Sequence, residues 1–203
     1  MNDKQKNRKS VAKRLSRPAR GVRSDAQRNL LVVLDAAKEV FEASGVDAPV
    51  REIAAKAGFG VGTIYRHFPR RSELIAAVFR HELDACADAA PILAARHTPG
   101  EALARWLQRY ADLVATKRGL AGALHSGDSA FDALPAYFER RLKPALRKLL
   151  QAAVGAGEIR ADVDADELLT AVAGLCMSSR GDRPDYSRRM IALLVDGLRY
   201  GAG

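Results

Sequence analysis

Four side chains within one short segment share an outward-facing, hydrogen-bonding chemistry. In a helix that begins near residue 61, Ile64 and Phe68 are expected to point inward. The side chains left facing outward all donate hydrogen bonds: Thr63, Tyr65, Arg66 and His67. Hydroxyls and cations near the start of a short helix suit the major groove of DNA, where they reach base edges and phosphates. Gly62 carries no side chain at this end, so the backbone is free to approach DNA closely.

A second short helix is predicted directly before this one. Its apolar residues recur at helical spacing and would face a core, whereas its charged residues stay in solvent: Val50, Ile53, Ala54 and Ala57 inside, Arg51, Glu52 and Lys56 outside. Gly58 is expected to end this helix, because glycine tolerates the left-handed conformation. Two short helices joined by a tight glycine turn predict a helix-turn-helix. The alternative is an ordinary helical hairpin whose basic residues form a solvated face.

The segment resembles the DNA-binding domain of the tetracycline-repressor (TetR) family, and the specific resemblance covers residues 26 to 83. The matching residues are Ile53-Ala54, Ala57-Gly58, Gly62-Thr63, Tyr65 and Phe68, followed by Arg70-Arg71-Ser72-Glu73-Leu74. The resemblance implies that Thr63, Tyr65 and His67 contact phosphates or bases, and that Arg71 replaces the family's phosphate-binding lysine. The full set of predicted DNA-binding residues is Arg51, Gly62, Thr63, Tyr65, Arg66, His67, Arg70 and Arg71.

Two positions depart from the family's pattern. The family often has Ser or Thr where Gly60 stands, and Lys, Arg or Pro where Val61 stands. A capping hydroxyl and one DNA contact are therefore missing, which alters the expected base preference.

The positive charge is concentrated at the start of the chain. The net charge is +9 over 203 residues, and residues 1 to 24 hold nine Lys and Arg against Asp3 alone, a net +8 that leaves +1 for residues 25 to 203. We predict a disordered basic arm over residues 1–23 that neutralises DNA phosphates or enters the minor groove. The alternative is a tail that serves solubility alone. No apolar run follows the cations, so we expect a cytoplasmic protein without a secretory signal or a membrane contact.

Other candidate sites fail on their spacing. His81, Cys86 and His97 fit neither one helical face nor a zinc loop, so no metal is expected. Cys86 and Cys176 are expected to be buried free thiols. The run from His125 to Asp128 holds nucleophile, base and acid types, but adjacent residues seldom form a triad. The glycines from Gly58 to Gly62 follow a helix rather than a strand, which argues against a phosphate loop. We expect no cofactor and no enzymatic activity.

The rest of the chain predicts an all-α fold of about nine helices. The first helix is expected to begin at Ser24, with Gln27 in a capping box, and to end at Gly45. A helix from Arg71 to about residue 90 would link two domains, because it is long enough to leave the first and enter the second. Further breaks are expected at Pro91, at 98–100, at 126–128, at 155–157 and at 180–184, with Asp164 and Glu167 capping the helix after 163. The predicted domains are a helix-turn-helix domain at 24–84 and an effector-binding and dimerisation domain at 85–203.

The last two predicted helices carry wide apolar stripes. Their members are Leu168, Leu169, Val172, Leu175 and Cys176, then Met190, Ile191, Leu194, Val195 and Leu198. Such a pair suggests a four-helix homodimer interface, which the resemblance also implies. The alternative is that both helices pack only on their own domain.

A small-molecule pocket is predicted in the second domain. Aromatic, apolar and cationic side chains that share a helix face or could close the space around it are Trp106, Arg109, Tyr110, Leu113, Leu124, Phe131 and Phe138. The alternative is a plain apolar core.

Together these features predict a dimeric, sequence-specific transcriptional regulator. We expect a repressor that binds double-stranded DNA at a palindromic operator and is released by a small-molecule effector. The alternatives are a non-specific polyanion-binding protein that acts through its basic tail, and a helical enzyme.

Overall fold

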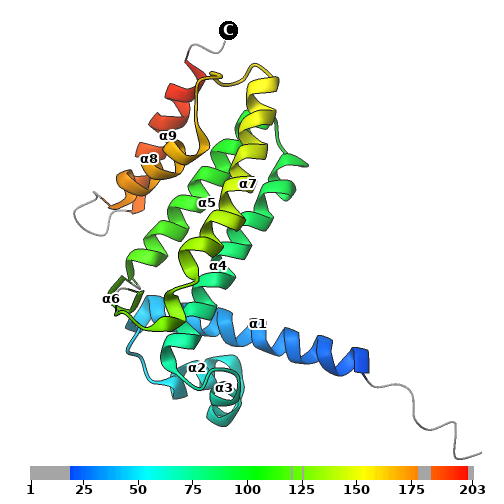
Figure 1. Ribbon diagram of the computed structural model, residues 1–203, viewed down its shortest axis with the longest axis vertical. Coiled ribbons are helices and arrows are strands. Elements are labelled where there is room, and N and C mark those ends of the chain that lie inside the picture. Colours follow the sequence, from blue (N-terminus) through cyan, green and yellow to red (C-terminus); the bar gives the residue numbers. More distant parts are fainter. Residues whose placement is uncertain (1–18, 120, 125, 178–183, 201–203) are drawn as a thin grey trace, which may run out of the picture.

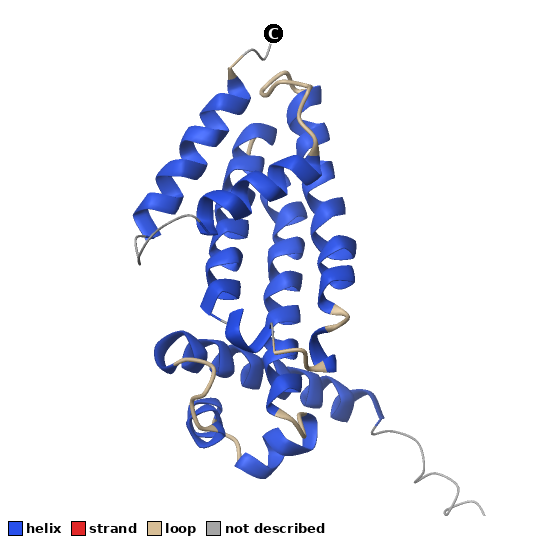
Figure 2. Ribbon diagram, turned by 60° about the vertical axis from the view of Figure 1, so that its left-hand side comes forward, coloured by secondary structure: helices blue, strands red, loops and turns tan. Residues whose placement is uncertain are grey.

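The computed structural model describes residues 19–119, 121–124, 126–177 and 184–200 of the chain. Within these ranges the protein contains nine α-helices and one short 3-10 helix, and none of these residues lies in a strand (Figure 2). The elements are α1 (Ala19–Ser44), α2 (Val50–Ala57), α3 (Val61–His67), α4 (Arg71–Ala94), α5 (Pro99–Gly119), α6 (Ala121–Leu124), η1 (Ser129–Phe131), α7 (Leu134–Gly155), α8 (Ala165–Met177) and α9 (Pro184–Arg199). The all-α prediction is confirmed.

The first four helices build the smaller unit of the molecule. Helix α1 lies across the lower end of the helical bundle, and α2 and α3 lie below it (Figure 1). Apolar side chains from these helices meet in one core, in which Ile53 is 0% exposed and Ile64 is 1% exposed. The start of α4 closes this core with the fully buried Leu74.

Helices α4, α5 and α7 form the larger bundle, and α8 and α9 lie against one side of it (Figure 1). Trp106 on α5 lies at the centre of this bundle with no exposed surface. Its indole Nε1 donates a hydrogen bond to the carbonyl oxygen of Cys86 on α4, over 2.9 Å, which satisfies the one polar atom of a buried indole. Its ring stacks on Tyr110 with 5.9 Å between centroids. This packing fixes α5 against α4.

Helix α4 belongs to both units. Ion pairs hold it to α1, since Lys38 Nζ lies 2.6 Å from Glu82 Oε2. On its other side, Asp84 accepts hydrogen bonds from the Tyr137 hydroxyl, at 2.7 Å, and from Arg141 Nε, at 2.6 Å, both on α7. The predicted division between residues 84 and 85 falls inside this continuous helix.

Two predicted helix boundaries were wrong. Helix α1 begins at Ala19 rather than at Ser24, so five residues assigned to the basic arm are helical. The prediction took Ser24 and Gln27 as a capping box, whereas both residues lie inside α1. Pro91 does not end α4, which continues to Ala94. Proline removes one backbone hydrogen bond from a helix. Because Pro91 lies in the last turn of α4, the other backbone hydrogen bonds of the helix remain.

The later predicted caps agree with the structure. Asp164 Oδ1 accepts hydrogen bonds from the backbone N–H groups of Asp166, at 2.7 Å, and Glu167, at 3.1 Å, at the start of α8. Cys86 and Cys176 are both buried, as expected, and burial raises the pKa of Cys86 to about 12. In the described ranges, no helix is both long and apolar enough to cross a membrane.

Candidate nucleic-acid interface and effector cavity

The turn between α2 and α3 depends on Gly58. Its φ of +72° lies in the left-handed region, which an L side chain rarely adopts. In this conformation the N–H of the next residue, Phe59, donates to the carbonyl oxygen of Ala54 over 3.0 Å, which satisfies a carbonyl at the end of α2. The chain therefore turns within the three residues between the two helices, and α3 starts at a fixed position after α2.

Helix α3 places its side chains as the sequence predicted. Ile64 is buried in the core, whereas Tyr65, Arg66 and His67 are exposed and Thr63 is half-buried. The Tyr65 side chain is 51% exposed, a large aromatic group left in solvent. A side chain that supplies both apolar area and a hydroxyl is suited to contact another molecule.

The start of α3 is open. Gly60 takes the N-cap position without a side-chain hydrogen bond, in agreement with the missing hydroxyl noted in the sequence. A Cβ atom placed on Gly62 would meet nothing within 4 Å. Packing within the chain therefore does not require glycine here, and the open space is available to a bound molecule.

Arg51 on α2 and Arg66 on α3 are exposed cations. Among the residues that the structure describes, neither forms an ion pair within 4.0 Å. Lys56, by contrast, is paired with Glu39 of α1, whose Oε2 lies 2.5 Å from its Nζ. The two arginines are therefore free to neutralise phosphates, whereas Lys56 already has a partner.

Arg71 is engaged within the protein. Its Nε donates to the carbonyl oxygen of Val46 over 2.6 Å, and its Nη2 donates to that of Ala48, also over 2.6 Å. The guanidinium carbon lies 5.7 Å from the centroid of the Phe41 ring. Arg71 thus ties the loop between α1 and α2 to the start of α4, a role that the sequence did not reveal.

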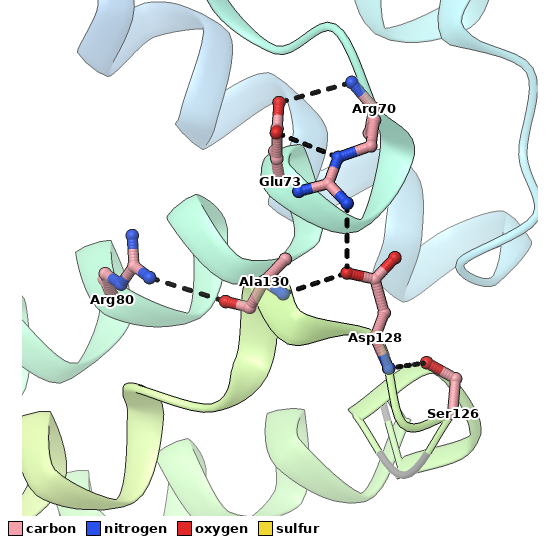
Figure 3. A network of polar contacts seen from close by, with 6 residues as sticks. All are labelled: Arg70, Glu73, Arg80, Ser126, Asp128 and Ala130. Carbon is pink, nitrogen blue, oxygen red and sulfur yellow. Dashed lines mark hydrogen bonds and ion pairs between the residues drawn. The ribbon is translucent and has the colours of Figure 1, made fainter.

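Arg70 connects the two units (Figure 3). Its Nε donates to Glu73 Oε1 over 3.0 Å, and its Nη1 lies 3.6 Å from Asp128 Oδ1 in the loop before η1. Asp128 also accepts a hydrogen bond from the N–H of Ala130 at 2.9 Å. The pKa of Asp128 is lowered, first by this backbone bond, then by the Ser72 hydroxyl, and further by Arg70. The ionised Asp128 carboxylate therefore connects the larger unit to Arg70, in the segment that follows α3.

A cavity of about 720 Å³ lies within the larger unit between α4, α5, α7 and α8. Five of the seven residues predicted to form a ligand pocket line it: Tyr110, Leu113, Leu124, Phe131 and Phe138. Trp106 lies outside its lining, in the core. Arg109 is exposed and lines a different cavity of about 480 Å³, beside α1. Sequence reasoning missed the polar part of the larger cavity, formed by Glu139, Lys143, Asp166 and Thr170.

Among the described residues of the run from His125 to Asp128, no side chains are arranged as a catalytic triad. His125 lies outside the described residues, Asp128 pairs with Arg70, and the Ser126 Oγ accepts the N–H of Asp128 over 3.4 Å. This segment positions α6 and η1 beside the smaller unit.

Two family models match this chain, one in the part that includes α2 and α3 and the other in the helical bundle. Residues 33–78 match the family model of bacterial regulatory proteins of the tetR family, and residues 98–200 match that of the SbtR-like transcriptional regulator C-terminal domain. An HTH-type transcriptional regulator of Staphylococcus aureus (strain USA300) is 36% identical over 64 residues, 31% of this chain. The match spans 35% of that relative's own length, about a third of it.

Solved structures resemble the whole described architecture. A TetR transcriptional regulator from Streptomyces coelicolor is 38% identical with a TM-score of 0.75, covering 84% of this chain and 98% of that one. A TetR transcription regulatory protein from Mycobacterium vanbaalenii is 36% identical with a TM-score of 0.67, covering 88% and 99%. With an N-terminal helix-turn-helix and a C-terminal helical bundle that both match, this chain belongs to the TetR family of transcriptional regulators.

Proposed function

We propose that the protein is a dimeric, cytoplasmic repressor that binds a palindromic operator and leaves it when a small molecule binds. The observation that carries this proposal is the surface of α3, where Tyr65, Arg66 and His67 are exposed around the buried Ile64. This arrangement presents hydroxyl, cationic and imidazole groups on a rigid helix of a size that enters the major groove. TetR regulators typically bind operator DNA and small-molecule ligands as dimers.

Helices α8 and α9 supply the surface for the proposed dimer. Part of their apolar stripe is covered within one chain, since Val172 and Ile191 are both 0% exposed. Outside that stripe, Leu193 on α9 is 62% exposed and Met177 on α8 is 57% exposed. Large apolar side chains left in solvent on two adjacent helices favour burial against a second copy. Such a dimer would carry two α3 helices for two half-sites.

The effector signal is proposed to pass through Asp128. Leu124 and Phe131 line the large cavity and flank Asp128 in the sequence, and Asp128 pairs with Arg70 at the start of α4. A ligand that displaces Leu124 or Phe131 would shift this carboxylate and with it the orientation of α3. The ligand must then bind the DNA-incompetent arrangement more tightly, because only differential affinity shifts the equilibrium.

The test is a selection of bound fragments from the organism's genomic DNA at physiological salt with the full-length protein. We expect an enriched inverted repeat, with half-sites separated by one helical turn or a multiple of it. Strong binding at low salt without any enriched sequence would contradict the proposal and favour the basic tail as the binding element.

Removal of residues 1–18 separates these two modes of binding, because it leaves α1 complete. The repressor is expected to keep its operator preference with lower affinity and a shallower salt dependence. A protein that binds through its tail would instead lose DNA binding altogether.

A further inference from the structure

The large cavity has an apolar body and one polar end. Four aromatic rings line the body, from Phe79, Tyr110, Phe131 and Phe138, with Tyr110 and Phe138 at 6.1 Å between centroids. Apart from the Tyr110 hydroxyl on α5, the polar groups come from α7 and α8: Glu139, Lys143, Asp166 and Thr170. A volume of about 720 Å³ with this lining fits a compact molecule that contains a ring.

The cation at the polar end is already neutralised. Lys143 Nζ is in direct contact with Glu139 Oε2 and lies 3.1 Å from Asp166 Oδ2. These bonds raise the pKa of Lys143, with Glu139 as the largest cause, so the ammonium stays charged and paired. Arg147 also approaches this cluster from outside the lining, with its Nη2 3.9 Å from Asp166 Oδ2, so both cations here are already paired with carboxylates. An anionic ligand would have to compete with both carboxylates for Lys143.

The remaining polar groups of the cavity are acceptors. The Thr170 hydroxyl donates its proton to the carbonyl oxygen of Asp166 over 2.8 Å, and the Tyr110 hydroxyl points its proton to the carbonyl oxygen of Leu169 at 3.4 Å. Burial raises the pKa of Tyr110 well above its usual value, so this hydroxyl remains neutral. Asp166 Oδ1 has no hydrogen-bond partner among the described residues and almost no contact with water. The Asp166 side chain as a whole is 46% exposed, so the carboxylate can rotate and accept a hydrogen bond on this oxygen from a ligand in the cavity.

We propose that this cavity binds a compact, ring-containing apolar molecule that carries a hydrogen-bond donor, best a protonated amine, and discriminates against carboxylates. The inference rests on the proposed function, in which this cavity is the effector site. The apolar body lies among the aromatic rings, and the donor faces Asp166 and Glu139. Asp166 is thereby a specificity-determining residue.

The test compares three probes with the same ring body: 2-naphthylmethylamine, 2-naphthalenemethanol and 2-naphthoate. Binding to the full-length protein at pH 7 is measured by isothermal titration calorimetry. We expect the amine to bind at least tenfold more tightly than the carboxylate, with the alcohol between them. Equal or tighter binding of the carboxylate overturns the proposal, as does the failure of all three probes to bind at millimolar concentration.

Two variants and one control locate the site. Asp166→Asn is expected to weaken amine binding about tenfold and to reduce the preference over the carboxylate. Glu167→Gln removes the same charge from the same turn of α8 outside the cavity lining, and it should leave the ranking unchanged. Ala173→Trp, which fills the cavity, should abolish binding of every probe. Identical effects of Asp166→Asn and Glu167→Gln, or full binding by a folded Ala173→Trp protein, would contradict the assignment.

Operator binding is measured separately, by fluorescence anisotropy without any probe. Loss of operator binding with the probe ranking intact would refute the repressor proposal alone. Intact operator binding with a preference for the carboxylate would refute the ligand class alone.

Discussion

Two adjacent arginines at the start of α4 have different partners, which changes what each can do on DNA. Arg71 uses its donors on the carbonyl oxygens of Val46 and Ala48, whereas Arg70 pairs with carboxylates. Hydrogen bonds from a charged donor to partly buried carbonyls hold the loop that leads into α2. The proposed phosphate contact of Arg71 would therefore come in addition to a role in the fold.

Arg71→Ala is expected to lower both stability and DNA affinity. Loss of the carbonyl contacts should reduce the free energy of unfolding by about 1.5–3 kcal/mol, which urea unfolding measures. If Arg71 also contacts a phosphate, the slope of log affinity against log salt should flatten by about one. If Arg71→Ala lowers the free energy of unfolding but keeps the wild-type slope of log affinity against log salt, Arg71 has a structural role and no phosphate contact.

Tyr65→Phe is expected to weaken operator binding while leaving the fold intact. The side chain is 51% exposed, so its hydroxyl contributes little to folding. Loss of one hydrogen bond of about 0.5–1.5 kcal/mol corresponds to a two- to tenfold change in Kd, measured by fluorescence anisotropy. Operator affinity equal to that of wild type would remove Tyr65 from the interface.

The elements around the turn were predictable because their signals are local. Gly58 determines where α2 ends, and apolar residues at helical spacing determine which side of α3 is buried. These signals lie within a few residues of the structure that they determine. The contact between Arg70 and Asp128 joins residues 58 positions apart, so no sequence period reveals it. For the same reason the sequence grouped Arg109 with Tyr110, although the structure places Arg109 at a different cavity.

Alanine substitutions at two glycines of this element are expected to have opposite effects. Gly62→Ala should stabilise the protein by about 0.5–1 kcal/mol, because the new Cβ meets nothing and alanine loses less entropy in a helix. It should also weaken operator binding if the DNA backbone approaches there. Gly58→Ala should destabilise by about 1–2 kcal/mol, because its φ is +72°. Thermal unfolding and anisotropy are the measurements, and unchanged DNA affinity in Gly62→Ala would contradict the close approach.

The segment between α6 and η1 is expected to carry the effector signal. Asp128→Asn removes the charge that faces Arg70, so 2-naphthylmethylamine should change operator affinity less than it does in wild type. The ratio of operator Kd with the amine to operator Kd without it should therefore approach one. Asp132→Asn is the matched control, an exposed carboxylate just beyond η1. The same ratio in both variants would show that this segment does not couple the two sites.

At the scale of the whole molecule, the proposed dimer decides whether two α3 helices can act together. Apolar surface on α8 and α9 is divided between a buried part and an exposed part. The predicted stripe included Ile191, which the packing of α9 on α5 and α8 covers, but it did not include Leu193, which remains in solvent. The predicted stripe thus serves mainly the core of one chain, and the exposed apolar residues beside it are proposed to contact a second copy.

Leu193→Glu is expected to convert the proposed dimer to a monomer. A carboxylate buried in an apolar interface without a partner is strongly unfavourable. Ile92→Glu places the same charge on a comparably exposed apolar residue of α4, 52% exposed, and should leave the assembly unchanged. Sedimentation velocity distinguishes the two states, and an intact dimer in Leu193→Glu would exclude this face as the interface.

The continuity of α4 sets a rule for building hybrid regulators from this protein. A junction that exchanges one sensor domain for another must fall within a helix that both units share, since α4 runs from Arg71 to Ala94 without a break. Each residue inserted into an α-helix rotates the downstream part of the helix by about 100° and shifts it by about 1.5 Å. Chimeras joined there should therefore keep the helical register of the parent chain, and those with one added residue should aim their two α3 helices away from successive half-sites.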